Sequence, residues 1–383
     1  MNINFIKKKD NLYNADIIGN DILELYEDKE KTDIFYRAFD YDPRKNQISE
    51  IAPDIKKYTL ISIQSCICDP DRFYFASYTI ADEDVIFTVY EYEARSSAAK
   101  KIFSFTEDKS ILTVAKKIKI FVLDSSDFLI QIESLAPEKL SELMGVISFD
   151  IRLYSSESGS FLDIVIPDFK NNGINTMIPL SENRLMIKCG YSFLEDKRID
   201  RLSEKEALIE SIYITSTSQF ISDLKINTTA GNMRLMDTAY FDKCLTGPGV
   251  KDDIIFYNKT DLAEGICEIN YINANTLEKY KFRKDYSENV YCHVPVVISG
   301  VPYILTREDN RERFLNLSSG LEDMEFINEK FICSAGNILI FSKKRRGKER
   351  LRIYSYPSVN LIFEDQMTFC NMTYKNDEYY IYI

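Results

Sequence analysis

The sequence predicts an all-β repeat protein, and three observations lead to that fold class. Short apolar runs rich in Ile, Val, Tyr and Phe follow one another with turn residues between them. Almost no stretch shows sustained helical periodicity. A similar hairpin recurs along most of the 383 residues. The composition agrees, because 45% hydrophobic and 28% charged residues are ordinary for a folded protein and exclude a largely disordered one.

The recurring hairpin indicates the architecture. An aromatic strand end, often Tyr, leads into a polar turn and then into an apolar strand. Copies occupy residues 41–48, 154–161, 213–220, 271–277 and 354–361, with a weaker copy from Tyr92 and one without Tyr near residues 314–321. Successive copies start about 40 to 62 residues apart, which is the length of one four-stranded sheet with its connections.

These hairpins resemble the outer strand pair of propeller repeats of the WD-repeat, kelch and quinoprotein-like type. The resemblance implies a single closed β-propeller domain over residues 1–383. The chain has no Trp and only 13 Gly, so it carries neither a Trp-Asp dipeptide nor a kelch double glycine. The pattern therefore indicates an architecture and not a family.

With each hairpin taken as the outer half of a blade, we expect seven four-stranded blades. Six are complete within the chain. The seventh combines strands near residues 22–51 with strands in residues 368–383, so that N- and C-terminal strands share a blade and no sheet edge stays open. Six or eight blades, paired β-sandwiches and a β-solenoid are the alternatives.

Charge and cysteine usage restrict the class of partner and the compartment. A net charge of -12 repels phosphate backbones and anionic lipid surfaces, so we expect a protein partner, no nucleic acid and no membrane. No apolar run of about 18 residues and no signal-peptide pattern occurs. The eight cysteines lie scattered in strand-like stretches, which favours free thiols and a cytoplasmic protein.

The sequence assigns no catalytic residue, metal or cofactor. The one histidine, His293, lies in an apolar stretch and is either a candidate beside the central channel or a core side chain. Cys66 and Cys68 are two apart, so on a strand they point to one face, and no second pair completes a zinc set. Acidic clusters fall at expected turns, where solvated charges are the simplest explanation.

One basic stretch interrupts the acidic chain and provides the candidate binding residues. It lies on the hairpin between the middle strands of the last full blade and comprises Lys343, Lys344, Arg345, Arg346, Lys348, Arg350 and Arg352. An anion-binding surface and a solvated basic turn are the two interpretations. Two other middle-strand connections carry inserts, residues 134–145 and 193–210, the second with a capping box at residues 203–206 that predicts a helix.

For function, we expect a non-catalytic protein-interaction or scaffold module that binds through one decorated face of the propeller. The alternative is a propeller hydrolase or lyase that acts on a glycan or other small substrate through channel-facing carboxylates and tyrosines. A pocket with converging carboxylates favours the enzyme.

Overall fold

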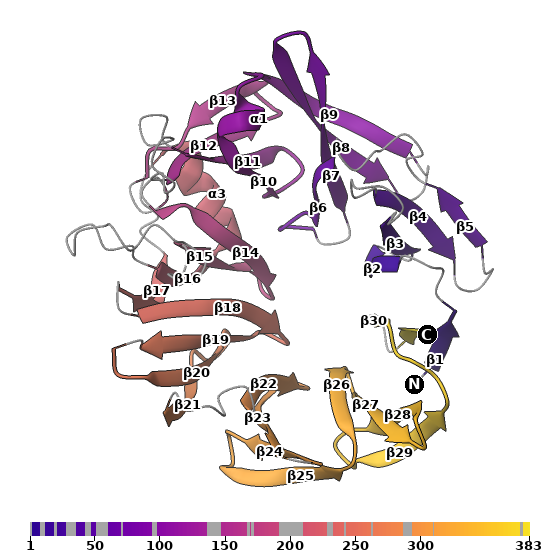
Figure 1. Ribbon diagram of the computed structural model, residues 1–383. Coiled ribbons are helices and arrows are strands. Elements are labelled where there is room, and N and C mark those ends of the chain that lie inside the picture. Colours follow the sequence, from indigo (N-terminus) through magenta and orange to yellow (C-terminus); the bar gives the residue numbers. More distant parts are fainter. Residues whose placement is uncertain are drawn as a thin grey trace. The chain divides into compact units, whose positions relative to one another are not determined.

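A computed structural model shows an all-β chain (Figure 1). It describes residues 2–7, 12–18, 21–27, 36–42, 47–50, 60–69, 72–93, 98–135, 147–166, 169, 172–190, 210–227, 233–240, 243–261, 263–285, 293–308, 310–375 and 378–383. Within these ranges lie seven four-stranded antiparallel sheets and one three-stranded sheet. The chain divides into two compact units, Lys9–Thr238 on the one hand and Met1–Lys8 with Ala239–Ile383 on the other.

The first unit holds four sheets, each built from four consecutive strands. Their bounds are β2 (Leu12–Ile18), β3 (Asp21–Glu27), β4 (Tyr36–Asp42) and β5 (Gln47–Glu50); β6 (Leu60–Ser65), β7 (Phe73–Ala81), β8 (Asp84–Glu93) and β9 (Ala98–Asp108); β10 (Ala115–Val122), β11 (Asp127–Leu135), β12 (Ile147–Ser155) and β13 (Ser160–Asp163); β14 (Ile174–Leu180), β15 (Arg184–Cys189), β16 (Glu210–Ser216) and β17 (Arg234–Ala239). Among the described residues of this unit, helix α1 (Ile111–Val114) lies between β9 and β10, and helix α3 (Thr217–Lys225) lies between β16 and β17.

The second unit holds three four-stranded sheets and the three-stranded one. Their bounds are β18 (Lys243–Lys251), β19 (Ile254–Asp261), β20 (Ile266–Asn273) and β21 (Lys279–Asp285); β22 (His293–Ile298), β23 (Val301–Glu308), β24 (Arg311–Asn316) and β25 (Leu321–Ile327); β26 (Lys330–Ala335), β27 (Ile338–Arg345), β28 (Lys348–Ser355) and β29 (Asn360–Asp365); β1 (Asn2–Ile6), β30 (Asn371–Lys375) and β31 (Glu378–Tyr382).

This succession of four-stranded antiparallel sheets is the strand organisation of a β-propeller, so the expected fold class is confirmed. The recurring hairpins are the third and fourth strands of their sheets. The copies near residues 41, 154, 271 and 354 correspond to β4–β5, β12–β13, β20–β21 and β28–β29.

Strands from the two ends of the sequence share one sheet, as expected. The partner from the N-terminal side differs from the expected one: β1 pairs in parallel with β31, with Phe5 opposite Ile381. The expected partner, residues 22–51, instead belongs to the complete sheet β2–β5. The shared sheet is therefore three-stranded and additional to the seven four-stranded sheets.

One hairpin copy is a helix in the structure. After β16, residues 217–225 form α3, whose Phe220, Ile221 and Leu224 are buried in the core of the first unit. The expectation of a tight hairpin at residues 213–220 is wrong, because burial of three apolar side chains on one helical face outweighs the β-like local pattern. Residues 136–146 and 191–209, which hold most of the two expected inserts and the capping box, lie outside the described residues.

An aromatic core holds the last two four-stranded sheets together. Rings of Phe314, Phe326, Phe331, Phe341 and Tyr354 contact one another at centroid distances from 4.0 to 6.3 Å. They come from strands β24 to β28, so the sheet β22–β25 packs against the sheet β26–β29 through contacts among these rings. The polar ends of the same strands are thereby fixed in position.

The described residues contain no helix with the length and apolarity that a membrane crossing requires.

Candidate functional site

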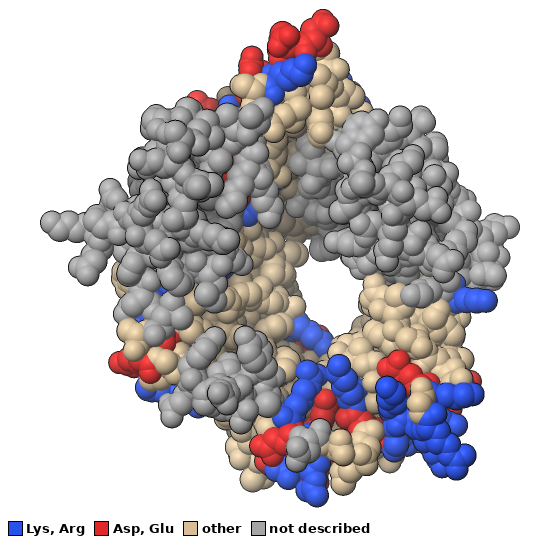
Figure 2. All heavy atoms as spheres, viewed as in Figure 1, with Lys and Arg blue, Asp and Glu red and all other residues tan. Residues whose placement is uncertain are grey.

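A recess of about 720 Å³ opens at one end of the sheets β22–β25 and β26–β29. Three segments line it: the turn from β23 to β24, the connection from β25 to β26, and the hairpin of β27 and β28. Its lining is mostly charged, with Arg307, Arg311, Lys330 and Lys344 against three glutamates. Figure 2 shows Lys and Arg side chains gathered over these two sheets, at the bottom of the view. The volume is in the range of small-molecule and peptide-residue sites.

A two-residue turn shapes one wall of the recess. The β27–β28 hairpin reverses at Arg346 and Gly347, which have φ values of 50° and 78°. Two consecutive residues with positive φ form the kind of turn whose twist matches a β-hairpin, and glycine adopts that conformation at low cost. The turn keeps the pairing in register to its end, so Lys344 stands opposite Glu349 on the wall.

The first carboxylate of the recess is Glu312, at 5% exposure. Arg307 Nε lies 3.0 Å from Glu312 Oε1, and the backbone N–H of Phe331 donates to Oε2. Burial raises the pKa of the Glu312 carboxyl, against the opposing effect of these donors. Because Phe331 belongs to β26, the carboxylate also joins the two sheets.

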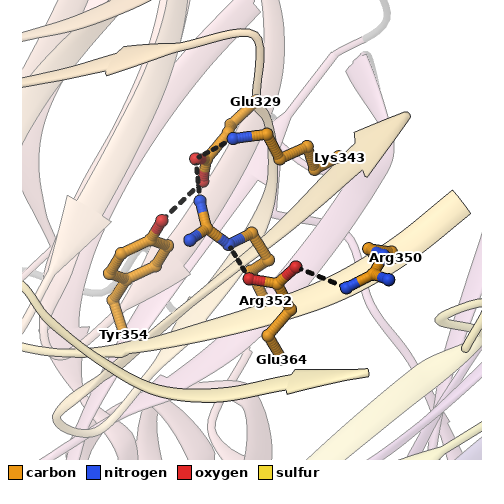
Figure 3. A network of polar contacts seen from close by, with 6 residues as sticks. All are labelled: Glu329, Lys343, Arg350, Arg352, Tyr354 and Glu364. Carbon is orange, nitrogen blue, oxygen red and sulfur yellow. Dashed lines mark hydrogen bonds and ion pairs between the residues drawn. The ribbon is translucent and has the colours of Figure 1, made fainter. Parts of the chain in front are cut away.

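The second carboxylate, Glu329, is the centre of a polar network (Figure 3). Its Oε1 accepts from Lys343 Nζ at 3.4 Å and from Arg352 Nη1, and its Oε2 accepts from the Tyr354 hydroxyl at 2.7 Å. Burial raises the pKa of Tyr354, so its hydroxyl remains a donor at neutral pH. The Glu329 side chain is only 6% exposed and is neutralised within the chain.

Glu364 on β29 extends this network toward the surface (Figure 3). Its two oxygens lie 2.8 Å from Arg350 Nη1 and 3.1 Å from Arg352 Nε. The hydrogen bond from Arg350 lowers the pKa of the Glu364 carboxyl. Arg352 thus bridges Glu364 on β29 and Glu329 in the connection between β25 and β26.

The structure divides the predicted basic residues into three groups. Lys343, Arg350 and Arg352 are held in ion pairs with Glu329 and Glu364. Lys344 lines the recess. The remaining three are exposed at the tip and take part in no ion pair among the described residues: Arg345, Arg346 and Lys348. Their expected role in binding stays a prediction.

The other two features that the sequence singled out do not line the recess. His293 is the first residue of β22, half-buried, with its ring stacked on Phe282 at 5.3 Å. Cys66 and Cys68 follow the end of β6 and do not share a strand face: Cys66 is buried and Cys68 is exposed. Burial raises the pKa of the Cys66 thiol to about 11. Across the part of the chain that the structure describes, no cluster of three His, Cys, Asp or Glu could hold a metal ion.

Sequence reasoning missed the residues that build the recess, above all Glu312, Glu329 and Lys330. None of these three residues stood out, because charged residues make up 28% of the chain. The available signal was the density of charge at two consecutive turns of one expected blade, residues 307–313 and 328–330, directly before the basic hairpin. They meet only in the folded chain, through the hydrogen bond from the Phe331 N–H to Glu312 and the pairing of β26 with β27.

Comparison with known proteins gives a fold likeness without a sequence family. No family model and no curated protein matches the sequence. Among solved structures, a prolyl endopeptidase aligns with 95% of this chain at 11% identity and a TM-score of 0.50. Dipeptidyl peptidase 4 from Porphyromonas gingivalis aligns with 93% at 9% identity and a TM-score of 0.52. The β-propeller domain of the Trilobed protease from Pyrococcus furiosus aligns with 96% at 11% identity, with a TM-score of 0.42 and 96% of its own length covered.

This chain spans about half, 52%, of each of the first two peptidases. At such identities the likeness establishes the fold. It also corrects the expected function, because the two solved structures that align at TM-scores of 0.50 and 0.52 are peptidases. The expectation of a non-catalytic interaction or scaffold module is therefore wrong, and the alternative of a hydrolase propeller is the better interpretation.

Proposed function

We propose that this chain forms the propeller part of a peptide hydrolase and binds the peptide that is cleaved. The observation that carries the proposal is the likeness to two peptidases along at least 93% of the chain, at TM-scores of 0.50 and 0.52. Since the chain spans 52% of each, a peptidase built in the same way has another part of similar size.

The recess at the ends of β22–β25 and β26–β29 supports a role in peptide binding. A peptide presents N–H donors, C=O acceptors and charged groups within a few ångströms of one another. The recess offers carboxylates, ammonium and guanidinium groups, and the amide side chains of Asn310 and Asn328 in one volume. A site lined in this way can satisfy the polar groups that a bound peptide removes from water.

The role of each site residue depends on how deeply its side chain is buried. Glu312 and Glu329 are nearly buried and are held by Arg307 and Arg352, so they fix the walls. The exposed Lys330 and Lys344 are free to meet a ligand. Bond cleavage is not assigned to these residues, and the proposal gives them substrate binding.

A peptide-digestion assay tests the proposal. The protein is purified through an affinity tag on the gene in its native host, so that any further segment or partner is retained. It is incubated with a peptide library derived from a proteome, and mass spectrometry identifies new termini. We expect cleavage at a reproducible set of sites.

A parallel purification from a strain that lacks the gene controls for contaminating peptidases. Cleavage present only in the tagged preparation, and removed by immunodepletion of the tag, supports the proposal. If the tagged preparation neither cleaves nor retains any peptide of the library, the proposal is wrong.

We also propose a reducing, cytoplasmic compartment. The support is that none of the seven cysteines of the described residues takes part in a disulfide. Burial raises the pKa of the thiols of Cys66, which is buried, and of Cys333, which is half-buried, and neither depends on a disulfide for packing.

A further inference from the structure

We infer that the peptide bound in the recess is acidic, with a carboxylate held between Lys330 and Lys344. This inference rests on the proposed function and adds the chemical class of the substrate. It rests on the position of the two lysines, on their exposure, and on the finding that neither forms an ion pair with another described residue.

The register of β26 and β27 places both lysines on one face. Lys330 is opposite Ser342, and Lys344 follows Ser342 by two residues along β27. Alternate residues of a strand point to the same face, so Ser342 and Lys344 share a side, and all three line the recess. Diagonal neighbours across an antiparallel pair lie roughly 7–8 Å apart, a span that one carboxylate between two ammonium groups can bridge.

Both lysines are exposed, and the charge of Lys330 also acts on the buried Glu312 carboxyl. Neither belongs to any ion pair of the described residues. By contrast, Lys343, directly before Lys344 in the sequence, is paired with Glu329. Lys344 stands opposite Glu349 in the register without forming a pair with it. Two unpaired ammonium groups in one concave site favour an anionic ligand.

Two of the three glutamates of the recess, Glu312 and Glu329, do not offer a competing site for a cation. Glu312 is compensated by Arg307, and Glu329 by Lys343 and Arg352. Their side chains are 7% and 6% exposed, so a ligand meets the lysines first. The third glutamate, Glu349, is exposed opposite Lys344, but the two lysines outnumber it, so the charge left to the ligand is positive.

An acidic peptide fits this arrangement better than a polyanion does. The recess presents two lysines, and Arg311 at its rim is loosely paired with Glu325 at 3.5 Å. The whole molecule carries a net charge of -12, which opposes a long phosphate backbone beyond this site. One or two carboxylates match the local charge.

Fluorescence anisotropy with labelled peptides tests the inference on the full chain. Two peptides of about ten residues differ only at two central positions, Glu in one and Gln in the other. We expect the acidic peptide to bind at least about fivefold more tightly, with an advantage that shrinks as salt rises.

Three variants locate the effect. Lys330→Gln and Lys344→Gln should each weaken the acidic peptide by about threefold to tenfold and leave the neutral peptide unchanged. Glu349→Gln should strengthen it by about twofold, because a competing charge is removed. Lys348→Gln is the matched control: it removes the same charge from the same exposed hairpin, outside the recess, and should change neither affinity.

The outcomes separate this inference from the proposed function. Equal binding of both peptides, or equal losses from Lys344→Gln and Lys348→Gln, overturns the acidic class while peptide binding stands. An oligonucleotide that binds more tightly than the acidic peptide and depends on the same lysines also overturns it. If neither peptide binds and the library is not cleaved, the proposed function itself fails.

Discussion

Adjacent side chains of the basic hairpin have different roles, because successive residues of a strand point to opposite faces of the sheet. On β27, Lys343 neutralises Glu329 and Lys344 lines the recess. On β28, Arg350 and Arg352 are two residues apart and both reach Glu364. The sequence predicted a basic hairpin correctly. It could not separate neutralised from available cations, because Glu329 lies 23 residues before its partner Arg352 and only the folded structure brings the two together.

Gly173 offers a test of packing in the first unit. Its φ is +69°, and a Cβ there would lie 2.4 Å from the Phe149 ring. Its N–H donates to the Phe169 carbonyl at 2.7 Å, so the backbone cannot move away freely. Gly173→Ala should lower the free energy of unfolding by about 3 kcal/mol, as conformational strain and overpacking add.

Gly159→Ala is the control for the conformational part alone. Its φ of +64° is similar, but nothing lies within 4 Å of the added Cβ. Gly159→Ala should lower the free energy of unfolding by about 1 kcal/mol. Urea denaturation of both variants measures the difference, and equal losses would mean that the Phe149 contact contributes nothing.

Among the elements, hairpins were predictable and the helix was not. A polar turn between an aromatic strand end and an apolar strand is a local signal, and β4–β5, β12–β13, β20–β21 and β28–β29 follow it. Helix α3 has nine residues and interrupts the same pattern between β16 and β17. Its Phe220, Ile221 and Leu224 become a recognisable face only once the core they enter is known.

The strand β1 was missed for a similar reason. Five residues, Asn2–Ile6, are too short to show a pattern of their own, and their partner β31 is at the other end of the sequence. Parallel pairing between such distant segments has no local signal. The expectation that the terminal strands share a sheet followed from the cost of open edges, which does not specify the residues.

Removal of residues 371–383 should destabilise the second unit. These residues form β30 and β31, whose Tyr379 and Ile381 cover Ile338, Ile340 and Ile353 of the neighbouring sheet. Loss of one large buried side chain costs about 2–5 kcal/mol, so loss of the hairpin should lower the melting temperature by more than about 10 °C and reduce solubility.

Removal of residues 1–6 alone is the comparison. It takes away β1 but leaves the β30–β31 hairpin on the same apolar cluster. The melting temperature should fall less than in the longer truncation. A melting temperature for the loss of residues 371–383 that matches the intact chain would contradict the packing of that cluster.

At the scale of the whole molecule, composition and repeat spacing were enough for the fold class. Seven four-stranded sheets follow from hairpins about 40 to 62 residues apart, since that spacing holds four short strands with their turns. Function was not accessible in the same way. The recess depends on side chains from three connections, and none of them forms a sequence motif that could distinguish a binding site from ordinary surface charge.

The central claim is that a peptide binds at the ends of β22–β25 and β26–β29. Hydrogen–deuterium exchange of the full chain, with and without a saturating acidic peptide, tests it most directly. We predict slower exchange at residues 310–312, 328–330 and 342–349, which line the recess, and unchanged exchange in β6–β9. Slower exchange confined to Lys9–Thr238, or none anywhere at saturation, would contradict the account.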